Sequence, residues 1–158
     1  SIVGLDRTAQ RFEQIEGGWS GRVNIWTHAW PMIWDYPILG TGLDTYKDAY
    51  YAYAPPEHSG KTTWNYAHND WLQVAIETGL VGFALVFVGY VWFLAVAIRQ
   101  WFRRRDPLAV GLGGGMIMAL VSIGIHSLVD FNMHIPANAL STMVVAGLGW
   151  NALFLRTQ

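Results

Sequence analysis

The sequence predicts an all-α integral membrane protein, and three observations support that prediction. Of the 158 residues, 53% are hydrophobic and only 13% are charged, which differs strongly from an ordinary soluble domain. Uncharged apolar runs occupy 80–98, 108–125 and 139–155. Charge is also uneven, with five Lys or Arg against nine Asp or Glu in 1–79 and five Arg against two Asp in 80–158. We therefore divide the chain into a polar loop region, 1–79, with short helices, and a transmembrane region, 80–158.

The first part of the polar region predicts two short elements. Residues 6–18 are mixed in charge, and the glycine pair 17–18 favours a linker or a short surface helix. Ser20 can cap a following helix, which Pro31 should kink or end. One face of that helix carries a cation and two indoles at four-residue intervals: Arg22, Trp26 and Trp30.

Loops and tyrosines follow. The stretch 35–42 is rich in Gly and Pro and predicts a turn, but its spacing matches no phosphate-binding loop. Four tyrosines in 44–53 suit either interfacial anchoring or stacking against sugars: Tyr46, Tyr50, Tyr51 and Tyr53. Residues 55–63 form a loop that returns the chain to His68 and can act as a mobile lid.

The stretch 66–80 is the centre of the sequence, because it joins polar chemistry to a membrane span. Asn69 suits the N-cap of a helix with Asp70 in its first turn, and Gly79 suits the stop. His68 then lies at the positive end of a helix dipole, which disfavours the protonated ring. A neutral imidazole suits a general base, although His68 can also serve only as a local hydrogen-bonding residue.

The apolar runs predict three spans. The 19 uncharged residues 80–98 reach about 30 Å, the thickness of the hydrocarbon core. The arginines of 99–106 follow at once and mark a cytoplasmic loop. The run 108–125 is glycine-rich and should pack closely, and 139–155 should return the chain to the cytoplasm. This topology places Arg22 and His68 together on the extracytoplasmic side.

Three polar residues between the second and third runs have four-residue spacing: His126, Asp130 and His134. On a helix they would share one face. A metal site, a structural polar network at the membrane edge and a contribution to the active-site wall all remain open, although Asn132 and Pro136 disfavour a clean helix and no further ligand supports a metal.

Other classes are disfavoured by composition. The chain contains no Cys, so it has no disulfide framework and no thiolate metal site. No basic, aromatic-rich patch favours nucleic acid. Since the chain begins with Ser1 rather than Met, and 1–5 suit the tail of an earlier helix, we expect the C-terminal portion of a longer membrane protein.

Four motifs occur in one order along the chain. They are Gly-Arg with a Trp four residues after the Arg (21–26), DYPILGTGL (35–43), AHNDWLQ followed by ETGLVG (67–82), and HSLVDF (126–131). This set resembles the O-antigen ligase and O-antigen polymerase superfamily of bacterial envelope glycosyltransferases. The resemblance implies a multi-spanning GT-C-like architecture in the bacterial inner (cytoplasmic) membrane, with the active site facing the periplasm.

The resemblance also implies a reaction. Members transfer a glycan from a polyprenyl-diphosphate carrier, such as undecaprenyl diphosphate, to a hydroxyl of lipid A core, a growing polysaccharide or a protein, without a metal or another cofactor. His68 matches the histidine that would deprotonate the acceptor, and Arg22 an arginine that would hold the diphosphate. We expect substrate contacts from Asn69, Asp70, Trp26 and Tyr66. Pro31 departs from the pattern, and family members carry a second arginine in an earlier loop.

Two other functions are consistent with the same residues. In a transporter or flippase for lipid-linked sugars, Arg22 and His68 would bind substrate without chemistry. In a membrane scaffold, the aromatic residues would only anchor the loop. Release of free polyprenyl diphosphate distinguishes the enzyme from the transporter, and tolerance to substitution over 22–70 would favour the scaffold.

Overall fold

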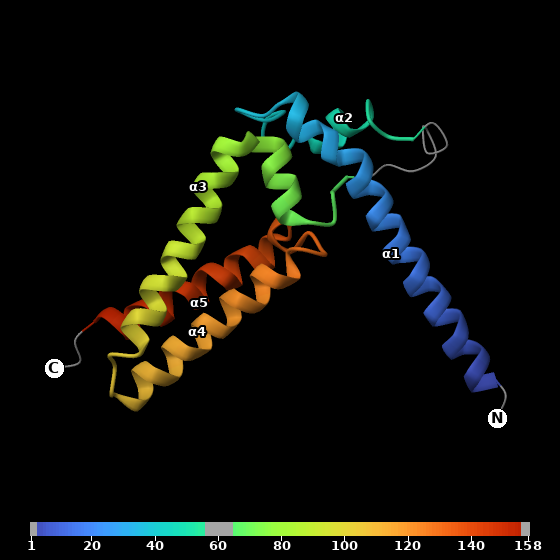
Figure 1. Ribbon diagram of the computed structural model, residues 1–158. Helices are drawn as coiled ribbons and strands as arrows, with labels where there is room; N and C mark the ends of the chain where they lie inside the picture. Colours follow the sequence, from blue (N-terminus) through green and yellow to red (C-terminus); the bar gives the residue numbers. More distant parts are fainter. Residues whose placement is uncertain (1–2, 56–64, 156–158) are drawn as a thin grey trace.

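The computed structural model describes residues 3–55 and 65–155, with side chains from residue 18 onward. Within those residues the regular elements are helices and no strand is present, which confirms the all-α prediction. Figure 1 shows α1 as one arm of an inverted V and α3, α4 and α5 as the other, with α2 near the apex. The predicted lid at 55–63 lies outside the described residues, apart from Pro55.

The first helix is much longer than predicted. α1, Val3–Asp35, runs unbroken for 33 residues. Of the two alternatives for 6–18, the linker was therefore wrong and the helix is observed, although it is not short, and the predicted cap at Ser20 was wrong. A glycine costs a helix about 1 kcal/mol, which a helix of this length can absorb. Pro31 does not end α1 either. It removes one backbone donor, but the next turn still forms, because the Tyr36 amide bonds the Met32 carbonyl at 3.0 Å.

The tyrosine segment is mainly part of the core. α2, Tyr46–Tyr50, buries both of its tyrosines, whose rings stack at 5.4 Å. The Tyr53 hydroxyl donates to Asp35 Oδ2 at 2.6 Å. Tyr46 and Tyr50 therefore serve neither as interfacial anchors nor as a sugar platform, and only Tyr51 is largely exposed.

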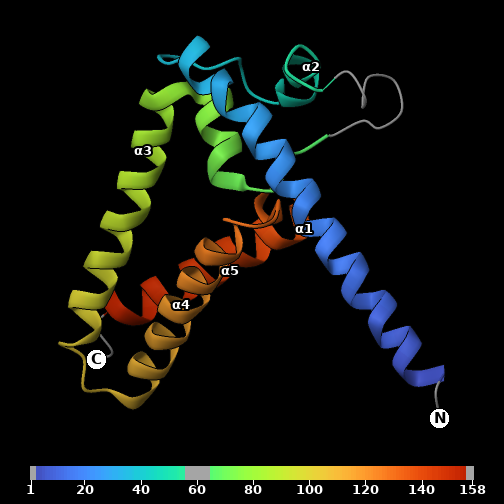
Figure 2. The same cartoon turned by 45° about the vertical axis from the view of Figure 1, so that its right-hand side comes forward.

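The third helix is two helices joined at a reversal. α3, Asp70–Trp101, begins at the predicted cap, where Asn69 Oδ1 accepts from the Leu72 amide at 2.9 Å. Gly79 has φ +67° and ψ −177°, which ends the first arm, 70–78, at the predicted stop. The second arm, 80–101, runs back in the opposite direction, as Figures 1 and 2 both show.

α4, Pro107–His126, and α5, Pro136–Phe154, lie side by side, joined through the 3-10 turn η2, Asn132–His134. Glycines allow the close contact that was expected of this region, since Gly113 lies against Leu153 and Gly149 against Met116. The far end of α5 is held by Arg104, which donates to the carbonyls of Leu153 at 2.6 Å and Leu155 at 2.7 Å.

Two hydrophobic clusters hold the chain together. The first joins α1, α2 and the first arm of α3 and includes Ile25, Met32, Tyr46 and Ile76. The second joins the lower part of α3 to α4 and α5 through Ala97, Met116, Leu120 and Leu153. The His68 loop lies where the first cluster meets the turn between α4 and α5.

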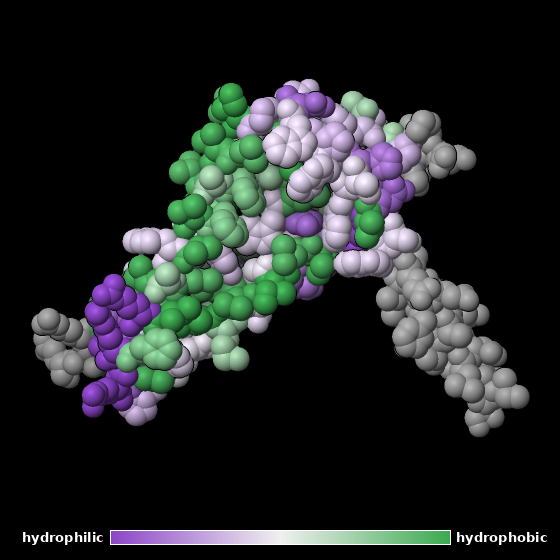
Figure 3. Space-filling view, in the orientation of Figure 1, coloured by the Kyte–Doolittle hydropathy of each residue, from purple (hydrophilic) through white to green (hydrophobic). Residues whose placement is uncertain are grey.

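The outer faces of α3, α4 and α5 are apolar, as in membrane helices. Within the described residues, α3 and α4 are long and apolar enough to cross a bilayer, and their apolar windows are mostly unburied, unlike core helices of soluble proteins. Hydrophobic residues cover these helices in Figure 3, and hydrophilic residues gather at the α3–α4 turn. α3 and α4 are therefore candidate membrane spans. α5 does not pass the same criterion, so the third span stays a prediction.

Candidate functional site

The loop before α3 is fixed on both sides of one residue, Ala67. Ala67 is fully buried; its carbonyl accepts from Trp26 Nε1 of α1 at 2.8 Å, and its amide donates to Gln73 Oε1 at 3.1 Å. The next residue, His68, has φ +51°. A left-handed conformation is uncommon for a residue with a Cβ and persists only where its surroundings enforce it. His68 therefore has an unusual backbone conformation, and it directly follows Ala67, which is held on both sides.

The imidazole of His68 faces a carboxylate. His68 Nδ1 lies 3.6 Å from Asp130 Oδ1, which is an ion-pair distance and longer than a hydrogen bond. The ring also packs edge-on against Phe131, with centroids 4.9 Å apart. Both side chains of the pair are about one quarter to one third exposed, 26% for His68 and 32% for Asp130. The pair is therefore accessible to another molecule.

Asp70 is buried and bound to the segment between α4 and α5. Its Oδ2 accepts from Ser127 Oγ at 2.8 Å and from the Met133 amide at 3.0 Å, and its Oδ1 pairs with His134 Nδ1 at 2.8 Å. Its amide in turn donates to the Ser127 carbonyl at 2.8 Å. The side chain expected to contact substrate instead ties the start of α3 to η2.

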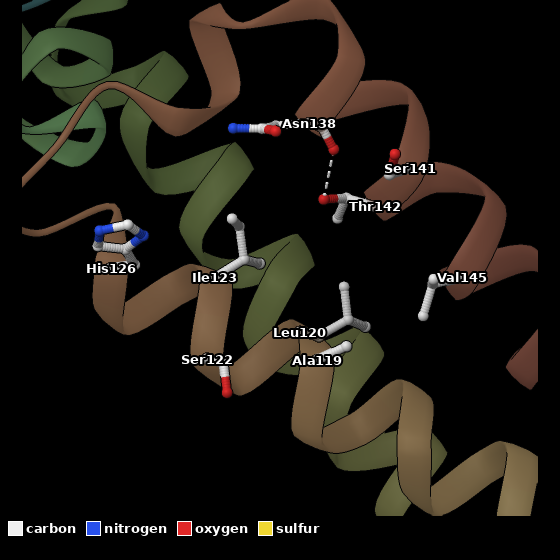
Figure 4. A pocket seen from close by; sticks show the side chains of 9 residues that line it. All are labelled: Ala119, Leu120, Ser122, Ile123, His126, Asn138, Ser141, Thr142 and Val145. Carbon is white, nitrogen blue, oxygen red and sulfur yellow. Dashed lines mark hydrogen bonds between the residues drawn. The ribbon is translucent and has the colours of Figure 1, made fainter.

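His126, Asp130 and His134 do not share a helical face, in agreement with the expectation that Asn132 and Pro136 disfavour a continuous helix. α4 ends at His126, and the chain then turns through η2, so the three side chains separate. Asp130 pairs with His68 and His134 with Asp70. His126 lines a different pocket, between α4 and α5, together with Asn138 (Figure 4). In the described part of the chain no three His, Asp or Glu side chains gather around a possible metal position.

Behind the loop runs a chain of buried hydrogen bonds. Gln73 Nε2 contacts Glu77 Oε1 at 3.0 Å and His134 Nε2 at 3.1 Å, while its Oε1 holds Ala67. This amide orientation pairs each donor with an acceptor when the His134 proton is on Nδ1, toward Asp70. The hydrogen bond that His134 donates to Asp70, with the charges of Asp70, Glu77 and Asp44, raises the pKa of His134 against the opposing effect of burial.

Sequence reasoning missed Gln73 and Glu77. Glu77 is buried, and its carboxylate also accepts from the amides of Asp44 and Tyr46 at 3.2 and 3.3 Å. A signal was available, since Asp70, Gln73 and Glu77 are spaced i, i+3 and i+7 and so share one helical face. Such a polar stripe usually faces water, whereas here it faces η2 and the start of α2.

Arg22 and Tyr66 lie on the two segments that adjoin the His68 loop. Arg22 is half-buried on α1, one turn before Trp26, whose indole bonds the residue before His68. Among the described side chains, no carboxylate lies within ion-pair distance of its guanidinium. Tyr66 stacks on Phe131 with centroids 4.9 Å apart, which places its ring beside that of His134, 5.2 Å away.

A groove opens beside the His68 loop, between α1 and α3. Its volume is about 540 Å³, and Asn69, Trp71 and Leu128 lie along one wall with Trp26, Trp30 and Trp34 of α1 along the other. The lining is almost wholly apolar and aromatic. An amphipathic molecule in this groove would have its polar end near Asn69.

Three of the first amides of α3 are bonded within the protein. The Asp70 amide donates to the Ser127 carbonyl, and the Leu72 and Gln73 amides donate to Asn69. These three donors are therefore used by the helix cap and the adjoining turn.

A comparison with protein families finds that the model described as O-antigen ligase matches residues 3–87. The match includes α1, α2 and the His68 loop, and it ends within the second arm of α3. Searches among curated proteins and among solved structures gave no match.

Proposed function

This chain belongs to the O-antigen ligase family, and we propose that it transfers a glycan from a polyprenyl-diphosphate carrier to a hydroxyl acceptor. The acceptor class comprises lipid A core, a growing surface polysaccharide and a protein hydroxyl. The family favours this enzyme over the alternative of a transporter or flippase without catalysis.

The observation that carries the proposal is the pairing of His68 with Asp130 at 3.6 Å, in a partly exposed loop where His68 is held in a left-handed backbone conformation. A base in this reaction must accept a proton and keep the resulting charge close to its counter-ion. Asp130 supplies that counter-ion. Its carboxylate also faces Nδ1, so we assign the other ring nitrogen, Nε2, to the acceptor hydroxyl.

The proposed step balances without a further reactant. The acceptor oxygen forms a bond to the anomeric carbon, and its proton passes to His68 Nε2. The bond between that carbon and the diphosphate oxygen breaks, and the carrier leaves with the electron pair as free polyprenyl diphosphate. A hydroxyl is a weak nucleophile, so positioning this transfer is typically worth about 10²- to 10⁴-fold in rate.

We propose that Arg22 compensates the charge that develops on the diphosphate. Its guanidinium is a planar donor that matches phosphate oxygens, and the half-buried setting strengthens the interaction relative to water. Trp26 and the groove would hold the neighbouring apolar part of the donor. Asn69 contributes to the groove wall, and Tyr66 lies near His68 through their shared neighbour Phe131. Asp70 holds the start of α3 in place. In this scheme the reaction requires no metal ion.

We further propose that the site faces the periplasm from the inner membrane. The arginine turn marks the cytoplasmic end of α3 and α4. α5 follows η2, whose Met133 amide donates to Asp70, so α5 starts near the His68 loop. Its other end lies at the arginine turn, where Arg104 donates to the Leu155 carbonyl. Since α5 connects the same two ends as α4, it crosses wherever α4 does, which gives the third span of a GT-C-like arrangement.

The test is transfer by protein in membranes or detergent, with lipid-linked donor and acceptor. We expect His68→Gln and Arg22→Gln to abolish release of free polyprenyl diphosphate while the protein still accumulates. His126→Gln is the matched control and should retain activity, because His126 lies in a separate pocket. A fully active His68→Gln enzyme would exclude the proposed base, and wild-type protein that moves the carrier without releasing diphosphate would indicate a transporter.

A further inference from the structure

The residue that fixes the His68 loop from inside the protein is Gln73. Its side chain is 2% exposed, and its Oε1 accepts the Ala67 amide at 3.1 Å. In the next peptide group, the Ala67 carbonyl accepts from Trp26 Nε1 at 2.8 Å. Ala67 is thus clamped between α1 and the first arm of α3, and the clamp ends one residue before His68.

The amide of Gln73 is itself held in a single orientation. Its nitrogen contacts Glu77 Oε1 at 3.0 Å and His134 Nε2 at 3.1 Å. Glu77 is an acceptor only, and His134 turns its other nitrogen to Asp70 at 2.8 Å. Rotating the amide by half a turn would set its oxygen against the Glu77 carboxylate and its nitrogen against the Ala67 amide. Both contacts would be unfavourable in a buried site.

Rigid support matters here because His68 has φ +51°. A residue with a side chain relaxes out of that region unless its neighbours prevent it. If the loop relaxed, the ring would leave Asp130, and a base displaced by about 1 Å commonly loses about 100-fold in rate.

We propose that Gln73, oriented by His134 and Glu77, is a positioning residue that keeps His68 in its reactive place. The inference rests on the proposed function, in which His68 is the base. Gln73 itself does not touch substrate. Its contribution should therefore appear in kcat and in the accessibility of His68, and it should leave donor binding unchanged.

The test compares wild-type protein in its membrane with Gln73→Met and Gln100→Met. Methionine keeps the length of glutamine and removes its hydrogen bonds. Gln100 is the matched control, because it also donates to a carbonyl of another helix, Leu153 at 3.1 Å, but at the opposite end of α3. One measurement is kcat and KM for the lipid-linked donor. The other is the rate at which diethyl pyrocarbonate modifies His68, resolved by mass spectrometry, with His126 as the internal reference.

We expect Gln73→Met to lower kcat by about 10- to 100-fold, with KM for the donor within about twofold of wild type. The modification rate of His68 should rise, that of His126 should stay constant, and Gln100→Met should behave as wild type. Wild-type kcat and wild-type His68 reactivity in Gln73→Met would overturn the proposal. A rise in KM at constant kcat would also overturn it, because Gln73 would then act on binding.

A second variant covers the case in which Gln73→Met fails to accumulate. His134→Asn keeps a donor at the position of Nδ1 for Asp70 and loses the contact with Gln73, so it should reproduce the fall in kcat and the rise in His68 reactivity. Wild-type behaviour of His134→Asn would count against the proposal. If wild-type protein shows no transfer while His68 reactivity still responds to Gln73, the positioning holds and the proposed function is wrong.

Discussion

The backbone of Gly40 lies directly against the backbone of Gly79. A Cβ placed on Gly40 would overlap the carbonyl group of Glu77, and one placed on Gly79 would overlap that of Ile38. Both residues have positive φ, +70° and +67°. Hydrogen bonds flank the contact, from the Thr41 amide to Ile76 at 2.9 Å and from the Leu80 amide to Pro37 at 2.8 Å. The two glycine-containing motifs of the sequence are therefore two halves of one structural unit.

We predict that Gly79→Ala and Gly40→Ala destabilise the protein. The left-handed conformation alone costs an alanine about 1–2 kcal/mol, and overlap with backbone adds to that cost because backbone cannot move aside. Thermal unfolding in detergent and the amount of folded protein in membranes measure the effect. Gly89→Ala is the control, since nothing lies within 4 Å of a Cβ there. Equal stability of Gly79→Ala and Gly89→Ala would contradict the close contact.

The Asp130 carboxylate should matter for turnover more than for binding. We predict that Asp130→Asn, which keeps size and removes charge, lowers kcat by about 10- to 100-fold with KM for the donor nearly unchanged. The reason is that the imidazolium formed in the transfer loses its counter-ion at 3.6 Å. Asp48→Asn, on the exposed surface of α2, is the charge-matched control. A normal kcat in Asp130→Asn would remove Asp130 from the mechanism.

When His134 is protonated, its Nε2 no longer accepts from Gln73 and the ring forms an ion pair with Asp70, which should make stability depend on pH. The pKa of His134 in the folded protein is raised above its ordinary value of 6.5, chiefly by the Asp70 hydrogen bond. Its contribution to the free energy of unfolding is then fully present below pH 6.5 and is lost as pH rises through the raised pKa. We expect the unfolding temperature to fall over this interval in wild type and in His126→Asn. In His134→Asn the unfolding temperature should lack the decrease that is due to deprotonation of His134. If His134→Asn had the same pH profile as wild type, the pairing of His134 with Asp70 would be contradicted.

The sequence predicted a helix boundary correctly where a single residue determines that boundary. The N-cap at Asn69 and the stop at Gly79 are properties of a side-chain oxygen and of a missing Cβ, and both occur as predicted. Residues 80–98 and 108–125 lie within the two candidate membrane spans, α3 and α4, because they lack charge over a sufficient length. The length of α1 was missed because two glycines and one proline were weighed locally, whereas the surrounding turns outweigh them.

The partners across the site could not be found from spacing alone. The four-residue interval from Asp130 to His134 suggested one helical face, but α4 ends at His126, and the turn sends these two side chains to different partners 62 and 64 residues away. Likewise, Asp70 has the pattern of a first-turn helix residue, while its burial depends on the Ser127 hydroxyl and η2. Long-range pairs of this kind need the fold before they can be assigned.

The proposed membrane topology can be tested by labelling single introduced cysteines, because the chain contains no Cys. Residues 80–101 extend for about 33 Å, so the α2 region and the arginine turn should lie on opposite sides of the membrane. An impermeant thiol reagent should label Asp48→Cys from the periplasm, and Arg105→Cys only after the inner membrane is opened. Ser59→Cys, outside the described residues, should behave as Asp48→Cys.

The same experiment decides whether α5 crosses. Arg104 donates to the carbonyl of Leu155 at 2.7 Å, so Leu155→Cys should be labelled with Arg105→Cys, from the cytoplasmic side. Met133→Cys, next to the Asp70 carboxylate, should be labelled with Asp48→Cys if the reagent reaches it. Labelling of Leu155→Cys from the periplasm would leave only two spans and would break the link between Arg104 and the end of α5. Labelling of Asp48→Cys from the cytoplasm would place His68 on the wrong face for a periplasmic acceptor.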